Sequence, residues 1–159
     1  MTDLDLPPIV LGCGKAKRKT PAHAVDMYTS AFNRAAARWA LSVAPLGRVY
    51  VLSAGYGLIP GAQTVAPYDV TFNRTGYAGG GAATGKPVTV DRIREQAAEL
   101  GLEGADVIVL AGTEYAARLH AAGLKVHRPF VRAARRRNGN ARTGYQAALL
   151  NAHHGRLPT

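Results

Sequence analysis

The sequence of 159 residues contains a single cysteine, Cys13. One cysteine excludes an internal disulfide framework and any zinc site built from several cysteines, and it is typical of a reducing cytoplasm. No apolar run approaches the roughly 20 residues that a membrane-spanning helix needs, so no membrane partner is expected. The first five residues carry two aspartates and no basic side chain, which is unlike a secretory signal peptide. The sequence therefore predicts a cytoplasmic protein.

Acidic residues are few, and they are absent from the last part of the chain. Residues 1–114 contain eleven basic and all ten acidic residues, whereas residues 115–159 contain nine basic residues and no acid. An acid-free basic segment is typical of proteins that bind a polyanion. The alternative is a solvated surface in a genome that favours arginine codons. The nine basic residues are Arg118, Lys125, Arg128, Arg132, Arg135, Arg136, Arg137, Arg142 and Arg156.

Three continuous apolar runs predict buried strands, at residues 8–12, 48–53 and 106–111, with a weaker fourth strand at residues 125–127. Continuous β-branched runs, in contrast to alternating ones, are typical of parallel strands that are covered on both faces. A chain of this length fits one domain.

Helical patterns separate these strands, at residues 27–43, 91–100, 113–122 and 143–153, with Thr89 and Thr113 as expected N-caps. Strand–helix alternation predicts a single α/β domain with a mostly parallel central sheet flanked by helices, followed by a basic C-terminal helical segment. Ligands of such sheets bind at the carboxyl ends of the strands.

The loop after the first expected strand is strongly basic. Lys15, Lys17, Arg18 and Lys19 follow Cys13 within six residues, and such a loop can bind phosphate through its side chains and backbone N–H groups. It lacks the third glycine of a dinucleotide fingerprint. Cys13 is either a nucleophile with cations nearby or a small packing residue, and packing is the favoured interpretation.

Tyrosine and serine side chains gather around the other strand ends. Ser53 and Tyr56 follow the second strand, and Tyr68 and Asp69 come about ten residues later. Asp69 is either a catalytic carboxylate or the first residue of an Asx turn. Tyr56 and Tyr68 are candidates for stacking on a nucleobase or hydrogen bonding to it.

Residues 27–30 open the first long expected helix. Tyr28 and the residues after it either cap this helix or bind phosphate at its N-terminus.

The glycine-rich stretch at residues 75–86 is interpreted as a surface loop that could close over a site. Its P-loop match fails, because Pro87 replaces the hydroxyl residue that holds magnesium. The five histidines lack zinc spacing, so neither a metal nor a cofactor is expected.

Three motifs resemble the YaaA-like family of peroxide-stress and DNA-associated proteins. They are residues 13–15 with 28–32, residues 51–59 followed by 67–71, and residues 144–146 near the C-terminus. The resemblance implies binding to double-stranded DNA. Its closest activity is that of a DNA glycosylase that excises 5-hydroxymethylcytosine.

A glycosylase must neutralise backbone phosphates, hold an extruded base and stabilise a cationic sugar. Asp69 would stabilise the cation or activate water, and Lys15 or Gln146 would hydrogen-bond the departing base. The expected base pocket and DNA-binding residues are larger sets. The pocket consists of Cys13, Tyr28, Ser53, Tyr56 and Tyr68, and the DNA surface of Lys17, Arg18, Lys19, Arg132, Arg135, Arg136, Arg137 and Arg142.

Two other functions stay open at this point. The chain could be a DNA-binding protein without catalysis, or a nucleoside or base-exchange transferase that uses the same site. Asp69 among tyrosines favours an enzyme, and the arginines of residues 132–142 favour DNA over a free nucleotide. A monomer associated with the nucleoid is the expected state.

Overall fold

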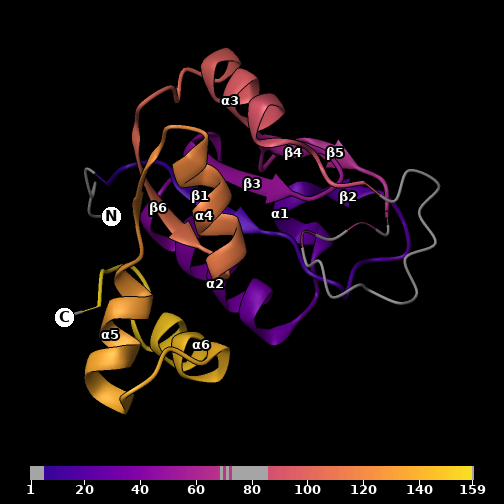
Figure 1. Ribbon diagram of the computed structural model, residues 1–159. Helices are drawn as coiled ribbons and strands as arrows, with labels where there is room; N and C mark the ends of the chain where they lie inside the picture. The colour runs from indigo at the N-terminus through magenta and orange to yellow at the C-terminus, as the bar shows by residue number, and fades with distance from the viewer. Residues whose placement is uncertain (1–5, 69, 71, 73–85, 159) are drawn as a thin grey trace.

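The computed structural model describes residues 6–68, 70, 72 and 86–158, which form an α/β domain around a five-stranded sheet (Figure 1). The strand order is β4-β3-β1-β6-β7. The strands are β1 (Ile9–Gly12), β3 (Val49–Ser53), β4 (Gly57–Pro60), β6 (Asp106–Leu110) and β7 (Lys125–His127). All neighbours pair in parallel except β3 and β4, which form an antiparallel hairpin. The expected fold class is confirmed.

β1 is the central strand, and it pairs with β3 on one side and β6 on the other. Ile9 lies opposite Val49 of β3 and Ile108 of β6. Every residue of β1 is buried, as its continuous apolar sequence predicts for a strand covered on both faces. The carboxyl ends of β1, β3 and β6 therefore meet at one edge of the sheet.

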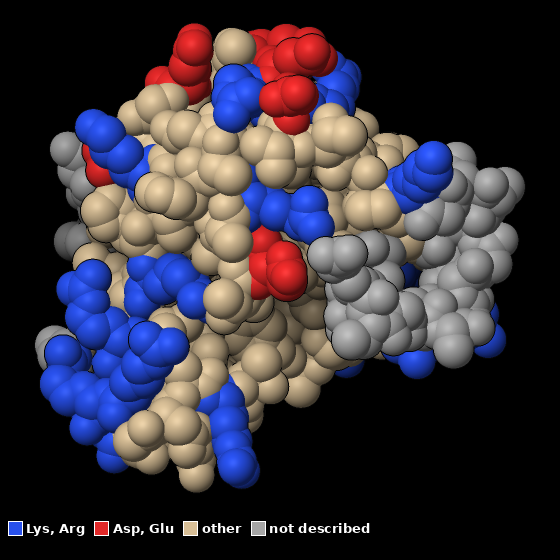
Figure 2. Space-filling model, viewed as in Figure 1, with Lys and Arg blue, Asp and Glu red and all other residues tan. Residues whose placement is uncertain are grey.

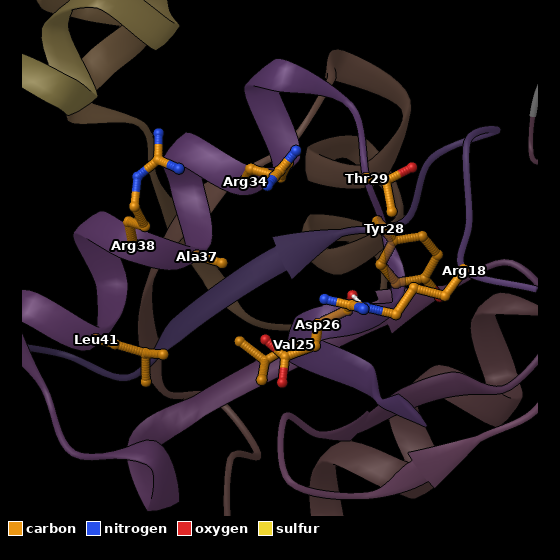
Figure 3. A pocket seen from close by; sticks show the side chains of 9 residues that line it. All are labelled: Arg18, Val25, Asp26, Tyr28, Thr29, Arg34, Ala37, Arg38 and Leu41. Carbon is orange, nitrogen blue, oxygen red and sulfur yellow. Dashed lines mark hydrogen bonds between the residues drawn. The ribbon is translucent and has the colours of Figure 1, made fainter. Parts of the chain in front are cut away.

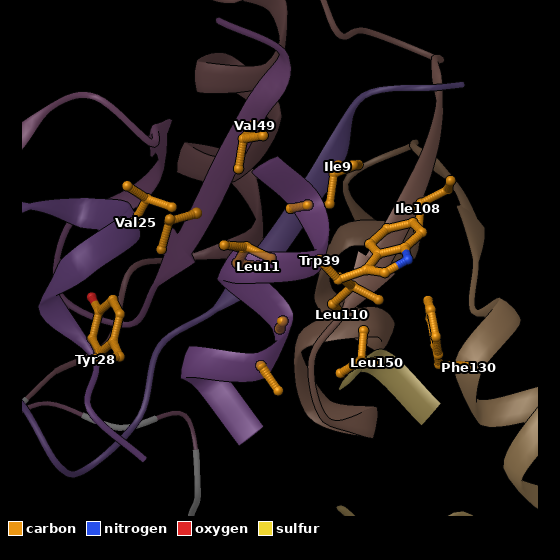
Figure 4. Close-up of a cluster of buried hydrophobic side chains, with 14 of the residues drawn as sticks. Ile9, Leu11, Val25, Tyr28, Trp39, Val49, Ile108, Leu110, Phe130 and Leu150 are labelled. Atoms are coloured by element: carbon orange, nitrogen blue, oxygen red, sulfur yellow. The ribbon is translucent and has the colours of Figure 1, made fainter. Parts of the chain in front are cut away.

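Helices cover both faces of the sheet, and alternate residues of β1 contact the two layers. Ile9 and Leu11 face a core that includes α2 (Ala31–Val43), α5 (Pro129–Asn138) and α6 (Thr143–Ala152) (Figure 4). Val10 faces a second core with α3 (Val90–Glu99) and α4 (Thr113–Ala121). The domain is thus a three-layer α/β/α arrangement.

Of the two expected N-caps, one is confirmed. Thr89 caps α3 by accepting a hydrogen bond from the Arg92 N–H at 3.1 Å, as expected. Ser30 caps α2 in the same way through the Asn33 N–H. The prediction that Thr113 caps α4 is wrong, because the N-cap is Gly112 and Thr113 is the first helical residue.

The segment before α2 differs from the expected single helix at residues 27–43. A short helix, α1 (Ala24–Met27), comes first, and an extended stretch at Tyr28 separates it from α2. β2 (Ala22–His23) pairs with β5 (Thr64–Val65) in a small antiparallel sheet beside it. These elements place Tyr28 next to the carboxyl edge of the main sheet.

The C-terminal helices α5 and α6 pack together and against α2 (Figure 1). The indole N–H of Trp39 on α2 donates to the backbone oxygens of His153 and Arg156, at 3.0 and 2.7 Å. The Trp39 ring contacts Phe130 of α5 edge to face. In the ranges that the structure covers, no helix is both long and apolar enough to cross a bilayer.

Candidate functional site

The carboxyl ends of the central strands lie close together, as the fold requires. The Cys13 N–H donates to the Leu52 carbonyl oxygen at 3.1 Å, which ties the end of β1 to the end of β3. On the other side, a methyl group on Gly12 would lie only 2.7 Å from the side chain of Ala111, just after β6. Only glycine fits at position 12 without a shift of the backbone, because the ends of β1 and β6 converge there.

Three hydroxyl groups form a hydrogen-bonded chain at this edge. The Ser53 hydroxyl donates to the Tyr68 hydroxyl at 2.6 Å, and the Tyr68 and Tyr28 hydroxyls are 2.7 Å apart. Ser53 is fully buried and also accepts hydrogen bonds from the N–H groups of Gly55 and Tyr56. With its acceptor sites occupied in this way, Ser53 directs its own proton toward Tyr68.

A thiol and a third phenol extend the chain of polar groups. The Cys13 sulfur lies 2.8 Å from the Tyr115 hydroxyl, and the Ala54 N–H donates to the same sulfur at 3.5 Å. Tyr115 lies in the first turn of α4, which follows β6. We refer to the whole group as the hydroxyl–thiol cluster; its members are Cys13, Tyr28, Ser53, Tyr68 and Tyr115.

The phenols of this cluster are held neutral. Burial raises the pKa of Tyr28, Tyr68 and Tyr115 well above the ordinary value for tyrosine, and the neighbouring Cys13 raises each of them further. A neutral phenol keeps its proton, so all three remain hydrogen-bond donors across the physiological pH range.

Tyr56 and Lys17 pack around the Tyr68 ring. The rings of Tyr56 and Tyr68 meet edge to face with centroids 5.4 Å apart, and the Lys17 ammonium lies 4.6 Å from the Tyr68 centroid. This cation–π contact places a basic residue of the first loop directly at the cluster. The Tyr68 ring also lies against Gly55, where a methyl group would approach to 2.8 Å.

The structure thus brings together all five residues of the expected base pocket. It does so from separate parts of the chain: the ends of β1 and β3, the stretch before α2, and the loop that contains Tyr68. For Cys13, the hydrogen bond to Tyr115 adds a polar contact that the packing interpretation did not foresee.

The three expected catalytic residues have different outcomes. Asp69 lies outside the described residues, as do residues 75–85 of the glycine-rich stretch. Lys15 is exposed in the loop that follows β1. Gln146 is buried on α6, where its side-chain amide donates to the Ala141 carbonyl oxygen at 2.6 Å. The hydrogen bond that the structure gives Gln146 is therefore local to the C-terminal helices.

The expected DNA-binding residues lie on two separate surfaces. Lys17, Arg18 and Lys19 lie in the first loop, near the cluster; Arg18 and Lys19 are exposed and Lys17 is half-buried. The others are exposed on α5 and just before α6, and Figure 2 shows a concentration of basic side chains over α5. Those of this second surface are Arg132, Arg135, Arg136, Arg137 and Arg142.

Two residues at the edge were missed by sequence reasoning. Tyr115 follows the third strand end by only a few residues, so the strand-end argument could have included it. Arg128 donates from Nη2 to the Ala111 carbonyl oxygen at 2.9 Å, and its Nε is buried without a hydrogen-bond partner among the described residues. Burial and the nearby Arg135 lower the pKa of Arg128. No sequence pattern indicates that the Arg128 side chain reaches the end of β6.

Within the described ranges, no three or more histidine, cysteine, aspartate or glutamate side chains are placed so that they could hold a metal ion. The polar chemistry of the described edge is therefore that of hydroxyls, one thiol and cations.

The sequence of residues 9–152 matches the profile of a family of unknown function, DUF6884. The chain belongs to the DUF6884 family. No curated protein and no solved structure gives a significant match. The family match spans every strand of the main sheet and the whole hydroxyl–thiol cluster, so the cluster belongs to the family's domain.

Proposed function

We propose that this protein is a DNA glycosylase that removes a modified pyrimidine, with 5-hydroxymethylcytosine as the first candidate. The observation that supports the proposal is the chain of neutral hydroxyls, Ser53 to Tyr68 to Tyr28, at a strand edge beside a basic loop. The resemblance of residues 51–59 and 67–71 to YaaA-like proteins supplies the candidate reaction.

The chemistry required is hydrolysis of an N-glycosidic bond. Water attacks C1′ of the deoxyribose, the bond from C1′ to the base nitrogen breaks, and the base leaves with the bonding electrons and then takes up a proton. Donors placed where this negative charge develops stabilise the transition state. Neutral phenols such as Tyr28 and Tyr68 can fill that role, because they keep their protons at neutral pH.

The base must also leave the duplex, which the aromatic groups and cations of the edge would assist. Tyr56 and Tyr68 offer ring surfaces against which an extruded base can pack. Lys17, Arg18 and Lys19 would contact the phosphates that flank it, while the arginines of α5 would bind the duplex further away. In this arrangement Asp69 supplies the carboxylate that stabilises the sugar cation or orients the water.

The test is release of the free base from duplexes that each carry one modified pyrimidine, with unmodified cytosine as the control. Asp69→Asn keeps the side-chain shape and removes the charge. Because the carboxylate acts mainly in the transition state, we expect kcat to fall by about 10²–10⁴-fold with little change in DNA affinity.

Cys13→Ser is the matched comparison, and it should keep most of the activity, because serine can retain the hydrogen bond to Tyr115. Full activity of Asp69→Asn would remove Asp69 from the mechanism. Release of no modified base from any duplex, together with salt-dependent DNA binding, would replace the proposal with a non-catalytic DNA-binding protein.

A further inference from the structure

A hollow lined by three arginines lies along α2, beside Tyr28 (Figure 3). Its volume is about 410 Å³, which is within the range of small-ligand sites. Arg34 and Arg38 line it from α2, and Arg18 lines it from the opposite side. We call this hollow the arginine groove. Asp26 is the one acid among its lining residues.

The α2 wall is a single stripe of the helix. Arg34, Ala37, Arg38 and Leu41 are spaced so that they share one face, and they extend about 10 Å along the helix axis. The pair Arg34 and Arg38 places two like charges one turn apart, an arrangement that destabilises an isolated helix. An anion between the two guanidinium groups would reverse that repulsion.

Arg18 and Arg38 donate hydrogen bonds to neutral groups. Arg18 donates from Nε to the backbone oxygen of Asp26 at 2.8 Å, and Arg38 donates from Nη2 to the Asn151 amide oxygen at 3.0 Å. These contacts fix both side chains without cancelling their charge. Across the described ranges, neither these two guanidinium groups nor that of Arg34 lies within 4.0 Å of a carboxylate.

We propose that the arginine groove binds the phosphate group of an anionic ligand. Guanidinium groups are the preferred partners of phosphate oxygens, because their N–H donors match the spacing of those oxygens. Thr29, which lines the end of the groove next to Tyr28, adds a hydroxyl donor. Leu41, at the other end and 44% exposed, offers an apolar surface for the rest of the ligand.

The phosphate can belong to a free phosphorylated metabolite or to a nucleic-acid backbone, which present the same chemistry to the groove. The site shares Arg18 with the proposed glycosylase function but goes beyond that function, since it depends on neither Asp69 nor base release. A failure of base excision would therefore leave the groove intact as a phosphate site.

The experiment is calorimetric titration of the whole chain with inorganic pyrophosphate and, separately, with a short single-stranded oligonucleotide. We expect saturable binding of pyrophosphate that weakens as salt is added. The double variant Arg34→Gln, Arg38→Gln should weaken it by about tenfold or more, because two charge-assisted hydrogen bonds are lost.

Asp26→Asn provides a test of opposite sign. Removing the one negative charge among the groove's lining residues should tighten pyrophosphate binding by roughly twofold to fivefold. If Asp26 only stabilised the fold, its replacement would weaken binding or leave it unchanged. Arg48→Gln is the matched control: Arg48 is also exposed and donates to a backbone oxygen, that of Leu6, but it does not line the groove. Unchanged thermal melting would show that each variant is folded.

The two titrations separate the possible sources of the phosphate. Tighter binding of the oligonucleotide, lost in the double arginine variant, would assign the groove to a nucleic-acid backbone, and pyrophosphate binding alone would assign it to a free metabolite. No saturable binding of either probe would overturn the proposal. An equal loss in Arg48→Gln would also overturn it, because it would show only a general effect of surface charge.

Discussion

Tyr68 joins three segments of the chain that are distant in sequence. Its hydroxyl contacts Ser53 and Tyr28, its ring packs on Tyr56, and Lys17 lies over its face. These contacts hold the Tyr68 side chain in one orientation. A binding site needs this of the side chains that contact its ligand. The neutral hydroxyl of Tyr68 is therefore a structural group as well as a candidate donor to substrate.

The raised pKa values of the buried phenols predict that the protein loses stability at high pH. In the unfolded chain tyrosine releases its proton near pH 10, whereas Tyr28, Tyr68 and Tyr115 keep theirs to higher pH when folded. Their contribution is thus fully present below about pH 10. It decreases as the pH rises further, by up to about 1.4 kcal/mol per pH unit for each tyrosine.

Urea denaturation at several pH values above 9 would measure this dependence. Tyr68→Phe should make this decline shallower by up to about 1.4 kcal/mol per pH unit, because one tyrosine that binds its proton more tightly in the folded state is removed. Equal slopes in Tyr68→Phe and the unchanged protein would show that Tyr68 ionises in the folded state as readily as in the unfolded one.

At the scale of elements, the β3–β4 hairpin shows how a turn supports the site. Gly57 has a φ of +85°, and a methyl group there would overlap the side chain of Gln96. Gln96 on α3 is buried; its Oε1 accepts from the Leu58 N–H and its Nε2 donates to the Tyr56 carbonyl oxygen. One glutamine therefore joins α3 to the turn that carries Tyr56.

We predict that Gly57→Ala destabilises the protein by roughly 2–4 kcal/mol, since it combines backbone strain with the displacement of two hydrogen bonds of Gln96. The control is Gly139→Ala at the end of α5. Gly139 has a similar φ of +78°, but a methyl group there would meet open space, so only the backbone cost of about 1 kcal/mol applies. Thermal or urea denaturation measures both, and equal losses would contradict the role of Gln96.

The elements that the sequence predicted well are those with long, uniform patterns. β1, β3 and β6 follow from continuous apolar runs and β7 from a weaker pattern, and α3, α4 and α6 begin and end within one or two residues of the expected limits. β4 was missed because Gly57 and Pro60 make a four-residue strand look like a turn. The expected helix at residues 27–43 began too early, because Ser30 is the N-cap of α2 and the backbone is extended at Tyr28.

The candidate site was predictable to the extent that topology determines it. Parallel strands must bring their carboxyl ends to one edge, so Cys13 and Ser53 could be placed together from sequence. The hydrogen bond between Cys13 and Tyr115 depends on how α4 leaves β6, which no local pattern encodes. The groove on α2 was missed for a similar reason: Arg18 reaches it only because of the fold of residues 14–30.

At the scale of the whole molecule, charge is distributed unevenly. Acidic side chains gather over α3 and basic side chains over α5, at opposite ends of the view in Figure 2. The last turn of α5 carries Arg135, Arg136 and Arg137, all exposed. Such an asymmetry orients the molecule in the field of a polyanion before any contact is made.

We predict that this end of the molecule dominates the salt dependence of DNA binding. If the basic surface covers about four to six phosphates, log K should fall with log salt at a slope of about −4 to −5. Replacing Arg135, Arg136 and Arg137 by alanine should flatten the slope and weaken binding to all sequences alike. Binding by electrophoretic mobility shift or fluorescence anisotropy over a salt series measures both quantities.

Replacement of Arg92 and Arg94 by alanine is the control for this experiment, because both arginines lie on α3 beside acidic residues and form ion pairs with them. Their removal should leave the slope nearly unchanged. An equal effect of the two sets of substitutions would mean that net charge alone, and not the surface of α5, determines the affinity.

Trp39 gives the molecule an intrinsic optical reporter. It is the one tryptophan in the sequence, it is buried, and its indole N–H is bonded to the backbone of the last residues of the chain. Its emission therefore reports on the docking of the C-terminal helices on α2 as well as on unfolding of the core. Partial detachment of those helices would admit water to the indole and move its emission to longer wavelength while the central sheet stays folded. Fluorescence compared with far-ultraviolet circular dichroism would thus distinguish release of this end from global unfolding without any added label.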